Sequence, residues 1–195
     1  GCLAALFTCS TLTAAAQPAF PNKPVRMIVP FPAGQATDMV ARMLAEGLSR
    51  SWGHQVVVEN RPGANGSLAA EATAKSPNDG YTILVGSIGT FAINMSLYKN
   101  PKYDVMRDFE AITVAVRTPN VLITPPGLPA NSVKEFIAFA KANPGKVSYG
   151  SSGSGSSDHL SAELFKQQTN TFGVHIPYRG GAAAQMDIMA GNIEA

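Results

Sequence analysis

Three segments of the sequence combine small residues with polar side chains, and each follows an apolar run. They are Phe31–Asp38, Gly86–Thr90 and Gly150–His159. Each also precedes a stretch with helical spacing, so each is predicted to lie where a strand leads into a helix. Unpaired N–H groups at a helix N-terminus bind anions, and glycine lets a ligand approach the backbone closely. The recurrence of this pattern favours a site for a small carboxylate.

Each of these loops also has a purely structural interpretation, because Ser, Asp and Gly are routine at turns and helix caps. Asp38 either senses a ligand ammonium group or stabilises the first turn of a helix. Arg179 either faces a ligand carboxylate or is simply solvated. Hydroxyl groups that can orient a carboxylate are supplied by Ser87, Thr90, Ser152, Ser154 and Ser156.

Catalytic and metal chemistry has weaker support in the sequence. The pair Asp158–His159 suggests a triad with a nearby serine, but adjacent residues diverge on a helix and no G-x-S-x-G motif occurs. His54, His159 and His175 lack metal-ligand spacing. Neither G-x-G-x-x-G nor G-x-x-x-x-G-K-[ST] occurs, so nucleotide sites have no support. We therefore expect no catalytic residue, no metal and no cofactor.

The composition narrows the class of protein further. Hydrophobic residues make up 45% of the 195 residues, which argues against disorder. The net charge is +2, from 15 basic and 13 acidic residues, with no run of either sign. This balance does not match the basic surface of a nucleic-acid-binding protein, so we expect no such partner.

The N-terminus has a composition of its own. The apolar stretch Leu3–Cys9 and the small residues Ala14–Ala16 match a secretory signal peptide, and residues 1–16 are predicted to be its remnant. The stretch is too short to span a bilayer as a helix. A buried helix and a lipid anchor at Cys9 are less favoured alternatives. Both cysteines, Cys2 and Cys9, lie in this segment, so the mature chain is predicted to lack disulfides and thiolate chemistry.

Alternating strands and helices are predicted to position the three loops. The first set has strands at 25–30, 56–58 and 81–86 and helices at 39–48 and 67–75, and Gly53 is predicted to stop the first of these helices. Two apolar strand-like runs follow within 111–124. The second set has strands at 147–149 and 173–177, with helices starting near 132, 160 and 182. This alternation indicates an α/β fold with mainly parallel sheets. We place one lobe at 17–118 and another at 119–195.

Several motifs together resemble the Bug family of periplasmic solute-binding proteins, the receptors of tripartite tricarboxylate transporters. The resemblance runs from about Pro21 to Ala195, in order and at family spacing. The motifs are Phe31-Pro-Ala-Gly-Gln-Ala-Thr-Asp38, Val56-Val-Val-Glu-Asn-Arg-Pro-Gly-Ala-Asn-Gly66, Asp79-Gly-Tyr-Thr82, Tyr149-Gly-Ser-Ser-Gly-Ser-Gly-Ser156, His159-Leu160, Glu163-Leu-Phe165 and His175-Ile-Pro-Tyr-Arg-Gly180.

The resemblance implies a two-lobed Venus-flytrap fold of the type II periplasmic class, with a small carboxylate in the cleft between the lobes. Family members are longer, so this chain is expected to be truncated. One departure is Gln35, which stands where the family commonly has the second of two glycines. The ligand-binding residues that the resemblance implies are Phe31, Ala33, Gly34, Gln35, Asp38, Ser87, Thr90, Asn94, Ser152, Gly153, Ser154, His159, Tyr178 and Arg179.

The function predicted from the sequence is an exported, periplasmic receptor. It would bind a small organic carboxylate as a monomer at full length and deliver it to a tripartite tricarboxylate-type membrane permease. Two alternatives remain open at this point. One is an exported α/β hydrolase that uses Ser154 or Ser156, and the other is a ligand sensor for a signalling kinase.

Overall fold

The computed structural model describes residues 19–195. The predicted signal remnant at 1–16 and both cysteines lie outside the described residues. Within the described part of the chain, no helix combines the length and the apolar character that crossing a membrane requires.

The first half of the chain forms a three-stranded parallel sheet, which we call the sheet of lobe 1. Its order is β2-β1-β3, with β1 at Val25–Val29, β2 at Val56–Asn60 and β3 at Thr82–Leu84. Helices α1 (Ala36–Trp52) and α2 (Ser67–Ala74) follow β1 and β2. The predicted parallel arrangement is confirmed, although β3 is shorter than the predicted strand at 81–86.

Lobe 1 is held together by an apolar core between its sheet and α1. Buried apolar residues of β1 share this core with the small residues Ala41 and Ala45 of α1, so the helix packs closely on the sheet. The core includes Val25, Met27, Val29, Ala41, Ala45 and Val56. Helix α1 ends where the sequence predicts, because Gly53 adopts a left-handed φ of 66° and donates its N–H to Ser49 O at 3.1 Å.

Four short elements complete lobe 1. They are η1 (Ala64–Gly66), the π-helical segment η2 (Gly89–Ile93), α3 (Asn94–Leu97) and α4 (Val105–Asp108). The last three follow β3, so the predicted loop at Gly86–Thr90 does open into helical structure.

Lobe 2 has a two-stranded parallel sheet of β4 (Val147–Ser151) and β5 (Gly173–Pro177). Its helices are α5 (Val133–Ala142), α6 (Ser157–Thr169) and α7 (Gly181–Met189). The core of this lobe is built on Phe136, Ala140, Val147 and Tyr149.

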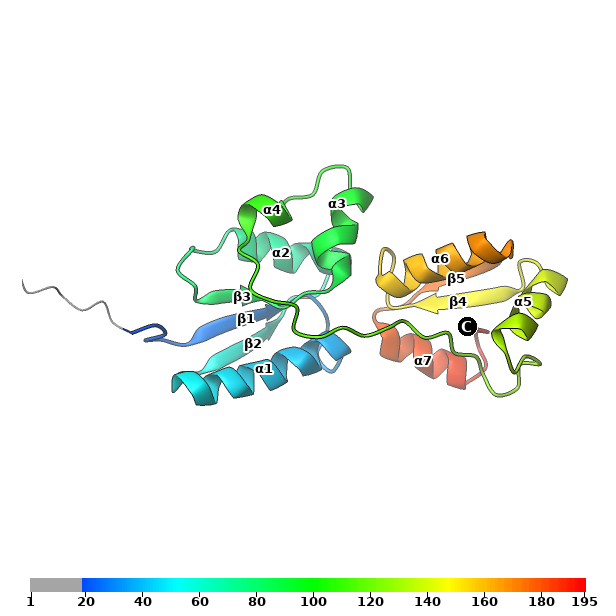
Figure 1. The fold of residues 1–195 in the computed structure, drawn as a ribbon, viewed down its shortest axis with the longest axis horizontal. Helices are drawn as coiled ribbons and strands as arrows, with labels where there is room; N and C mark the ends of the chain where they lie inside the picture. The colour runs from blue at the N-terminus through cyan, green and yellow to red at the C-terminus, as the bar shows by residue number, and fades with distance from the viewer. Residues whose placement is uncertain (1–18) are drawn as a thin grey trace, which may run out of the picture.

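The strands of the two lobes point toward each other. Figure 1 shows that the carboxyl ends of β1 and β4 both face the boundary between the lobes, and that α1, α6 and α7 begin at this boundary. Ligands of open α/β sheets bind beyond the carboxyl ends of the strands. The fold therefore brings the predicted loops of both lobes to one place.

The segment that connects the lobes differs from the prediction. We predicted two strand-like runs within 111–124, but no helix or strand is assigned from 109 to 124. Apolar side chains of this segment are exposed, with Ile112 at 75% and Val114 at 65%. A strand needs a neighbour for its backbone hydrogen bonds, and β propensity alone does not supply one.

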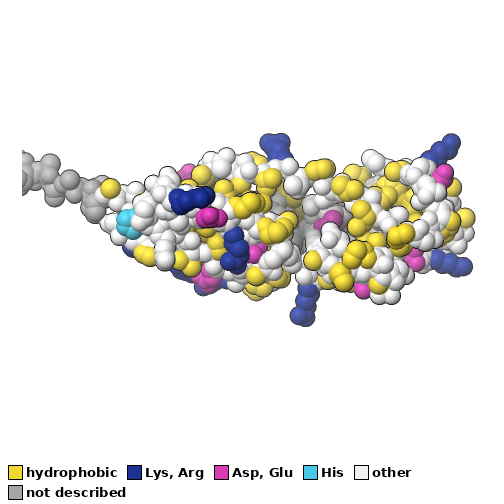
Figure 2. Space-filling model, turned by 90° about the horizontal axis from the view of Figure 1, so that it is seen from below, with side chains coloured by type: hydrophobic (Ala, Val, Ile, Leu, Met, Phe, Trp, Pro, Cys, Tyr) yellow, Lys and Arg dark blue, Asp and Glu magenta, His cyan; other side chains and the backbone are white. Residues whose placement is uncertain are grey.

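Apolar side chains also reach the surface of both lobes in the view of Figure 2.

Candidate functional site

The first loop, Phe31–Asp38, is closed by the carboxylate of Asp38. This carboxylate accepts hydrogen bonds from Gly34 N at 2.8 Å, from Arg42 Nε at 2.9 Å and from Asn60 Nδ2 at 2.8 Å. The hydrogen bond from Arg42 is the main cause that lowers the pKa of Asp38 to about 2, although burial opposes the shift. Asp38 is 1% exposed, so it shapes the loop instead of offering a free charge to a ligand.

The remaining predicted residues of this loop lie at the surface of the turn. Ala33 and Gly34 are exposed, and Gly34 has a φ of 83° that favours glycine. The carbonyl of Phe31 accepts a hydrogen bond from Asn60 Nδ2 at 2.9 Å. Asn60 therefore ties both ends of the loop together, a role that the sequence analysis did not assign to it.

The third loop, Gly150–His159, is closed in a related way by Asp158. Its carboxylate accepts hydrogen bonds from Ser152 N at 2.6 Å and from Ser152 Oγ at 2.8 Å. Burial alone would raise the pKa of Asp158, but the neighbouring hydroxyl of Ser156 and the two hydrogen bonds from Ser152 hold it below its ordinary value. Gly153 has a φ of 143°, and the side chain of Ser154 is exposed.

Two stacked imidazole rings, those of His159 and His175, pack against the third loop. His159 and His175 stack with ring centroids 3.8 Å apart. His159 Nδ1 accepts a hydrogen bond from Gly155 N at 3.1 Å, and His175 Nε2 lies 2.6 Å from Ser151 Oγ. Burial, followed by the neighbouring His159, lowers the pKa of His175. These contacts make His159 a support of the loop backbone.

The second loop places its predicted residues in the interior of lobe 1. Thr90 and Asn94 are each 0% exposed. Asn94 Nδ2 donates to Asn65 O at 3.0 Å, and Thr90 Oγ1 donates to the same carbonyl at 3.3 Å. In this structure both side chains thus support Asn65 and do not present polar atoms at the surface. Ser87 is half-buried, and its carbonyl accepts a hydrogen bond from Phe91 N at 3.0 Å.

Asn65 is a boundary residue that the site prediction missed. Its Nδ2 donates to Asn94 Oδ1 at 2.9 Å within lobe 1 and to Gly155 O at 2.9 Å in lobe 2. The sequence offered the Asn-Gly pair at 65–66, which is typical of any tight turn, and the family motif that ends with this pair, but neither assigned Asn65 to the site. Nothing local in the sequence indicates a partner 90 residues away.

The segment after β5 supplies the last two predicted residues. Tyr178 Oη donates to Asp187 Oδ2 at 2.6 Å, so its hydroxyl is engaged inside lobe 2. Arg179 is exposed, and within residues 19–195 its guanidinium makes no ion pair. Its carbonyl accepts a hydrogen bond from Gln35 Nε2 of lobe 1 at 3.2 Å.

Two helix N-termini therefore meet at the lobe boundary. Gln35 is the N-cap of α1, Gly180 is the N-cap of α7, and neither helix has a side-chain cap. Both helices begin at the boundary in Figure 1. Uncapped N-termini leave backbone N–H groups and a positive partial charge for an anion. Because the exposed residue Arg179 directly precedes the N-cap of α7, a cationic side chain is also available on this segment, and the boundary is chemically suited to a carboxylate.

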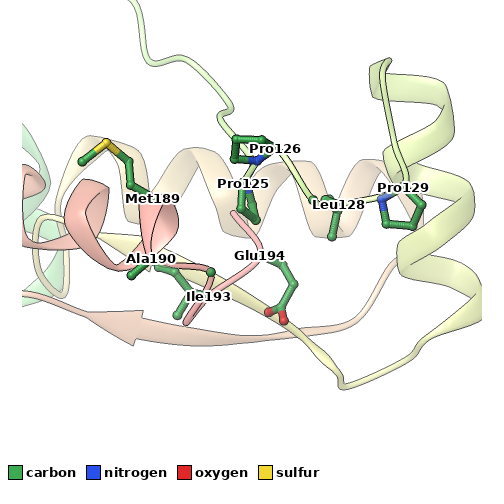
Figure 3. Close-up of a pocket in the computed structure, with 10 residues that line it drawn as sticks. Pro125, Pro126, Leu128, Pro129, Met189, Ala190, Ile193 and Glu194 are labelled. Atoms are coloured by element: carbon green, nitrogen blue, oxygen red, sulfur yellow. The ribbon is translucent and has the colours of Figure 1, made fainter.

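Two surface hollows of the structure are lined by residues other than those predicted for the site. One, of about 350 Å³, is lined by the proline-rich turn Pro125–Pro129 and by residues that follow α7, including Ile193 and Glu194 (Figure 3). Another, of about 430 Å³, lies in lobe 1 between Phe91 and Met106. The first hollow is at the opposite end of α7 from the boundary, so it is separate from the predicted site. Among the described residues, no group of three His, Cys, Asp or Glu side chains is placed to hold a metal ion.

A chain with two α/β lobes, whose strand ends and helix N-termini converge between them, has the architecture of a two-lobed binding protein. Comparison with known proteins gives the family. The chain belongs to the tripartite tricarboxylate transporter family receptors (TctC), whose model matches residues 40–195. It is 41% identical over 177 residues to the protein BugT of Bordetella pertussis, covering 90% of this chain and 54% of BugT. This confirms the predicted Bug-type family.

Solved structures agree with this assignment. The Rhodopseudomonas palustris protein Rpa4515 with adipate is 39% identical, with a TM-score of 0.86 over 90% of this chain and 58% of that one. The periplasmic binding protein BugD is 36% identical, with a TM-score of 0.76 over 90% of this chain and 58% of BugD. MatC from the same Rhodopseudomonas species, with bound malate, is 27% identical with a TM-score of 0.81, over 90% of this chain and 60% of MatC. The predicted two-lobed fold is confirmed.

The chain spans about half the length of the curated relatives it matches. The share of the relative is 54% for BugT and 57% for a protein from the tcbD–tcbE intergenic region of Pseudomonas sp. strain P51, which is 37% identical over 192 residues (98% of this chain).

Proposed function

We propose that the protein is a periplasmic solute receptor that binds a small organic carboxylate between its two lobes. The observation that carries this proposal is the meeting of the uncapped N-termini of α1 and α7 at the lobe boundary, with the exposed residue Arg179 immediately before the N-cap of α7. Relatives with adipate and malate support the same ligand class. Delivery to a membrane permease of the tripartite tricarboxylate type follows from the family. Export by the segment at 1–16, a monomeric state and the lobe boundaries 17–118 and 119–195 belong to this proposal.

We propose that the contacts to the ligand come mainly from backbone N–H groups and from Arg179. The exposed residues Ala33 and Gly34 of the first loop, Ser154 of the third loop and Arg179 of the segment after β5 are free to approach a ligand. Asp38, Asp158 and Tyr178 instead hold the loops in shape through their internal hydrogen bonds. Carboxylate binding by a preorganised backbone needs few charged side chains, in keeping with the low charged fraction of 14%.

Calorimetric titration of the full chain with adipate, malate, citrate, nicotinate and glutamate tests the proposal. We expect saturable binding of at least one of these carboxylates and no heat from a neutral diol of matched length. Arg179→Met should weaken that binding about tenfold, the scale of one charge-assisted hydrogen bond. A folded protein that binds none of the five compounds would contradict the proposal.

A hydrolase is the alternative with one specific observation in its favour, the short contact of Ser151 Oγ with His175 Nε2. Ser151, however, is 1% exposed, and a nucleophile must reach its substrate. Ser156 caps α6 and donates to Gly153 O at 2.7 Å, while Ser154 has no histidine partner among the described residues. We therefore propose a receptor without catalytic activity.

A further inference from the structure

Two carboxamide side chains of lobe 1 bridge the boundary to lobe 2. Gln35 Nε2 donates to Arg179 O at 3.2 Å, and Asn65 Nδ2 donates to Gly155 O at 2.9 Å. The donors lie on different loops of lobe 1, and the acceptors lie on different loops of lobe 2. The boundary is thus held at two separate points, in both cases by a side chain on one lobe and a main-chain carbonyl on the other.

Glycines on lobe 2 make these close approaches possible. Gly180 has a φ of 110°, and a Cβ added there would overlap the amide of Gln35. Gly155 has a φ of 81°, and a Cβ there would overlap Leu97 and lie 3.3 Å from Asn65 Nδ2. A residue larger than glycine would therefore take the space of the Gln35 amide at position 180, and at position 155 it would displace Leu97 and press on Asn65.

Asn65 is held in place before it reaches lobe 2. It has a φ of 50°, which residues other than glycine adopt less often, and the buried side chains of Asn94 and Thr90 both donate to its carbonyl. One hydrogen of its amide is used by Asn94 Oδ1, which leaves the other for Gly155 O. A donor fixed in this way loses little conformational entropy when it binds its acceptor.

We propose that Gln35 and Asn65 are closure latches, which hold the two lobes together and set the fraction of binding-competent protein without contacting the ligand. The inference rests on the proposed function, in which the ligand binds between the lobes. It gives Gln35, the departure from the family's glycine, a positioning role in place of the predicted ligand contact. Because apparent affinity scales with the competent fraction, loss of a latch weakens the binding of every ligand by the same factor.

The test measures the interlobe distance and the affinity in parallel on the full chain. Cys2 and Cys9 are replaced by serine, and spin labels are attached to cysteines introduced at the exposed positions Arg50 and Lys141, one on each lobe. Pulsed electron paramagnetic resonance then gives the distance distribution without ligand and with adipate. Titration calorimetry gives the affinities for adipate and malate.

The latch variants are Gln35→Met, which keeps the length of the side chain but cannot donate, and Asn65→Asp, which keeps its shape. Gln168→Met is the matched control, because Gln168 is exposed on α6 and makes no hydrogen bond to a described residue. Each latch variant should lengthen the ligand-free interlobe distance and weaken adipate and malate about fivefold, by equal factors. The control should match the unmodified protein.

An unchanged distance distribution in Gln35→Met would overturn the proposal, and so would unequal losses for the two ligands, because a residue that touches the ligand distinguishes between them. If neither adipate nor malate binds, the interlobe distance in the ligand-free protein still tests the latch, and the proposed function is tested separately by the titration with all five carboxylates. Gln35→Met keeps the test decisive if Asn65→Asp does not fold, because Gln35 lies outside the buried cluster of Asn94 and Thr90.

Discussion

The first loop of lobe 1 and the third loop in lobe 2 share a design but differ in how firmly they are closed. In each, an aspartate in the first turn of a helix accepts the N–H of an earlier loop residue, Gly34 for Asp38 and Ser152 for Asp158. Asp38 has in addition a guanidinium and a carboxamide as partners, whereas Asp158 is held by its neighbouring serines. The comparison shows that one local pattern is stabilised by charge in one lobe and by neutral groups in the other.

The same contrast extends to the surroundings of each loop. Asn60, at the end of β2, joins the first loop to the neighbouring strand. The third loop rests on the stacked pair of His159 and His175, and burial lowers the pKa of His175. We therefore expect the first loop to tolerate changes of pH, and the third loop to respond to them.

The largest expected effect is that of Asp38→Asn. The variant keeps the size of the side chain but loses the charge that Arg42 pairs with, and it brings an amide NH₂ next to the donors Gly34 and Asn60. We expect the free energy of unfolding to fall by about 2–3 kcal/mol. Chemical denaturation of the full chain measures this, with Glu46→Gln on the exposed face of α1 as control. A loss no larger than the control's would show that the charge does not stabilise the loop.

Asp158→Asn should have a smaller effect, because no cation is lost. We expect a decrease of about 1.5 kcal/mol in the free energy of unfolding, the lower end of the range for a hydrogen bond to a charged group. If Asp158→Asn proved as costly as Asp38→Asn, the contrast between charged and neutral closure would be wrong.

The two lobes should also differ in how their stability depends on pH, and this expected effect is smaller still. The lowered pKa of His175 means that the folded state binds fewer protons than the unfolded state as the pH falls through about 6.5. Stability from this residue is therefore complete above that pH and declines below it. For Asp38 the sign is reversed: its contribution is present above about pH 4 and is lost as the pH falls toward 2.

Between pH 7.5 and 5.5, the midpoint of denaturation should thus fall in the unmodified protein and fall less in His175→Gln. In Asp38→Asn, the denaturation midpoint should fall with pH by the same amount as in the unmodified protein over this range. If the denaturation midpoint changed equally with pH in His175→Gln and in the unmodified protein, His175 would not be the source of this pH dependence.

The smallest expected effect is that of Ser154→Ala. This exposed side chain makes no hydrogen bond to a described residue, so we expect stability to change by less than about 0.5 kcal/mol. The variant distinguishes the receptor from a hydrolase that uses this serine. A several-fold change in carboxylate affinity with no turnover fits a residue near the ligand, whereas the loss of a measured hydrolytic activity would contradict the receptor.

Local patterns predicted the elements of the fold well. The spacing of apolar residues from Met39 to Leu48, followed by Gly53, was enough to predict α1, because an amphipathic face and a left-handed C-cap are local features. The runs within 111–124 were wrong as strands, because pairing depends on a neighbour that the local pattern does not contain.

The predicted site illustrates the same limit. Sequence reasoning found the loops, because small residues between a strand and a helix mark them. It could not assign Asn94 to the interior or Asn65 to the boundary, since both placements depend on contacts made by the folded lobes. Gln35 was noticed only as a departure from the family pattern, and its partner on lobe 2 required the structure.

The central claim is that a carboxylate is held between the lobes by groups from both. A crystal structure of the full chain with adipate tests it most directly. The account predicts a carboxylate oxygen within hydrogen-bond distance of a backbone N–H at the start of α1, and another contact from Arg179 or the start of α7. A ligand bound in one lobe alone, such as in the hollow beside Pro125–Pro129, would contradict the account.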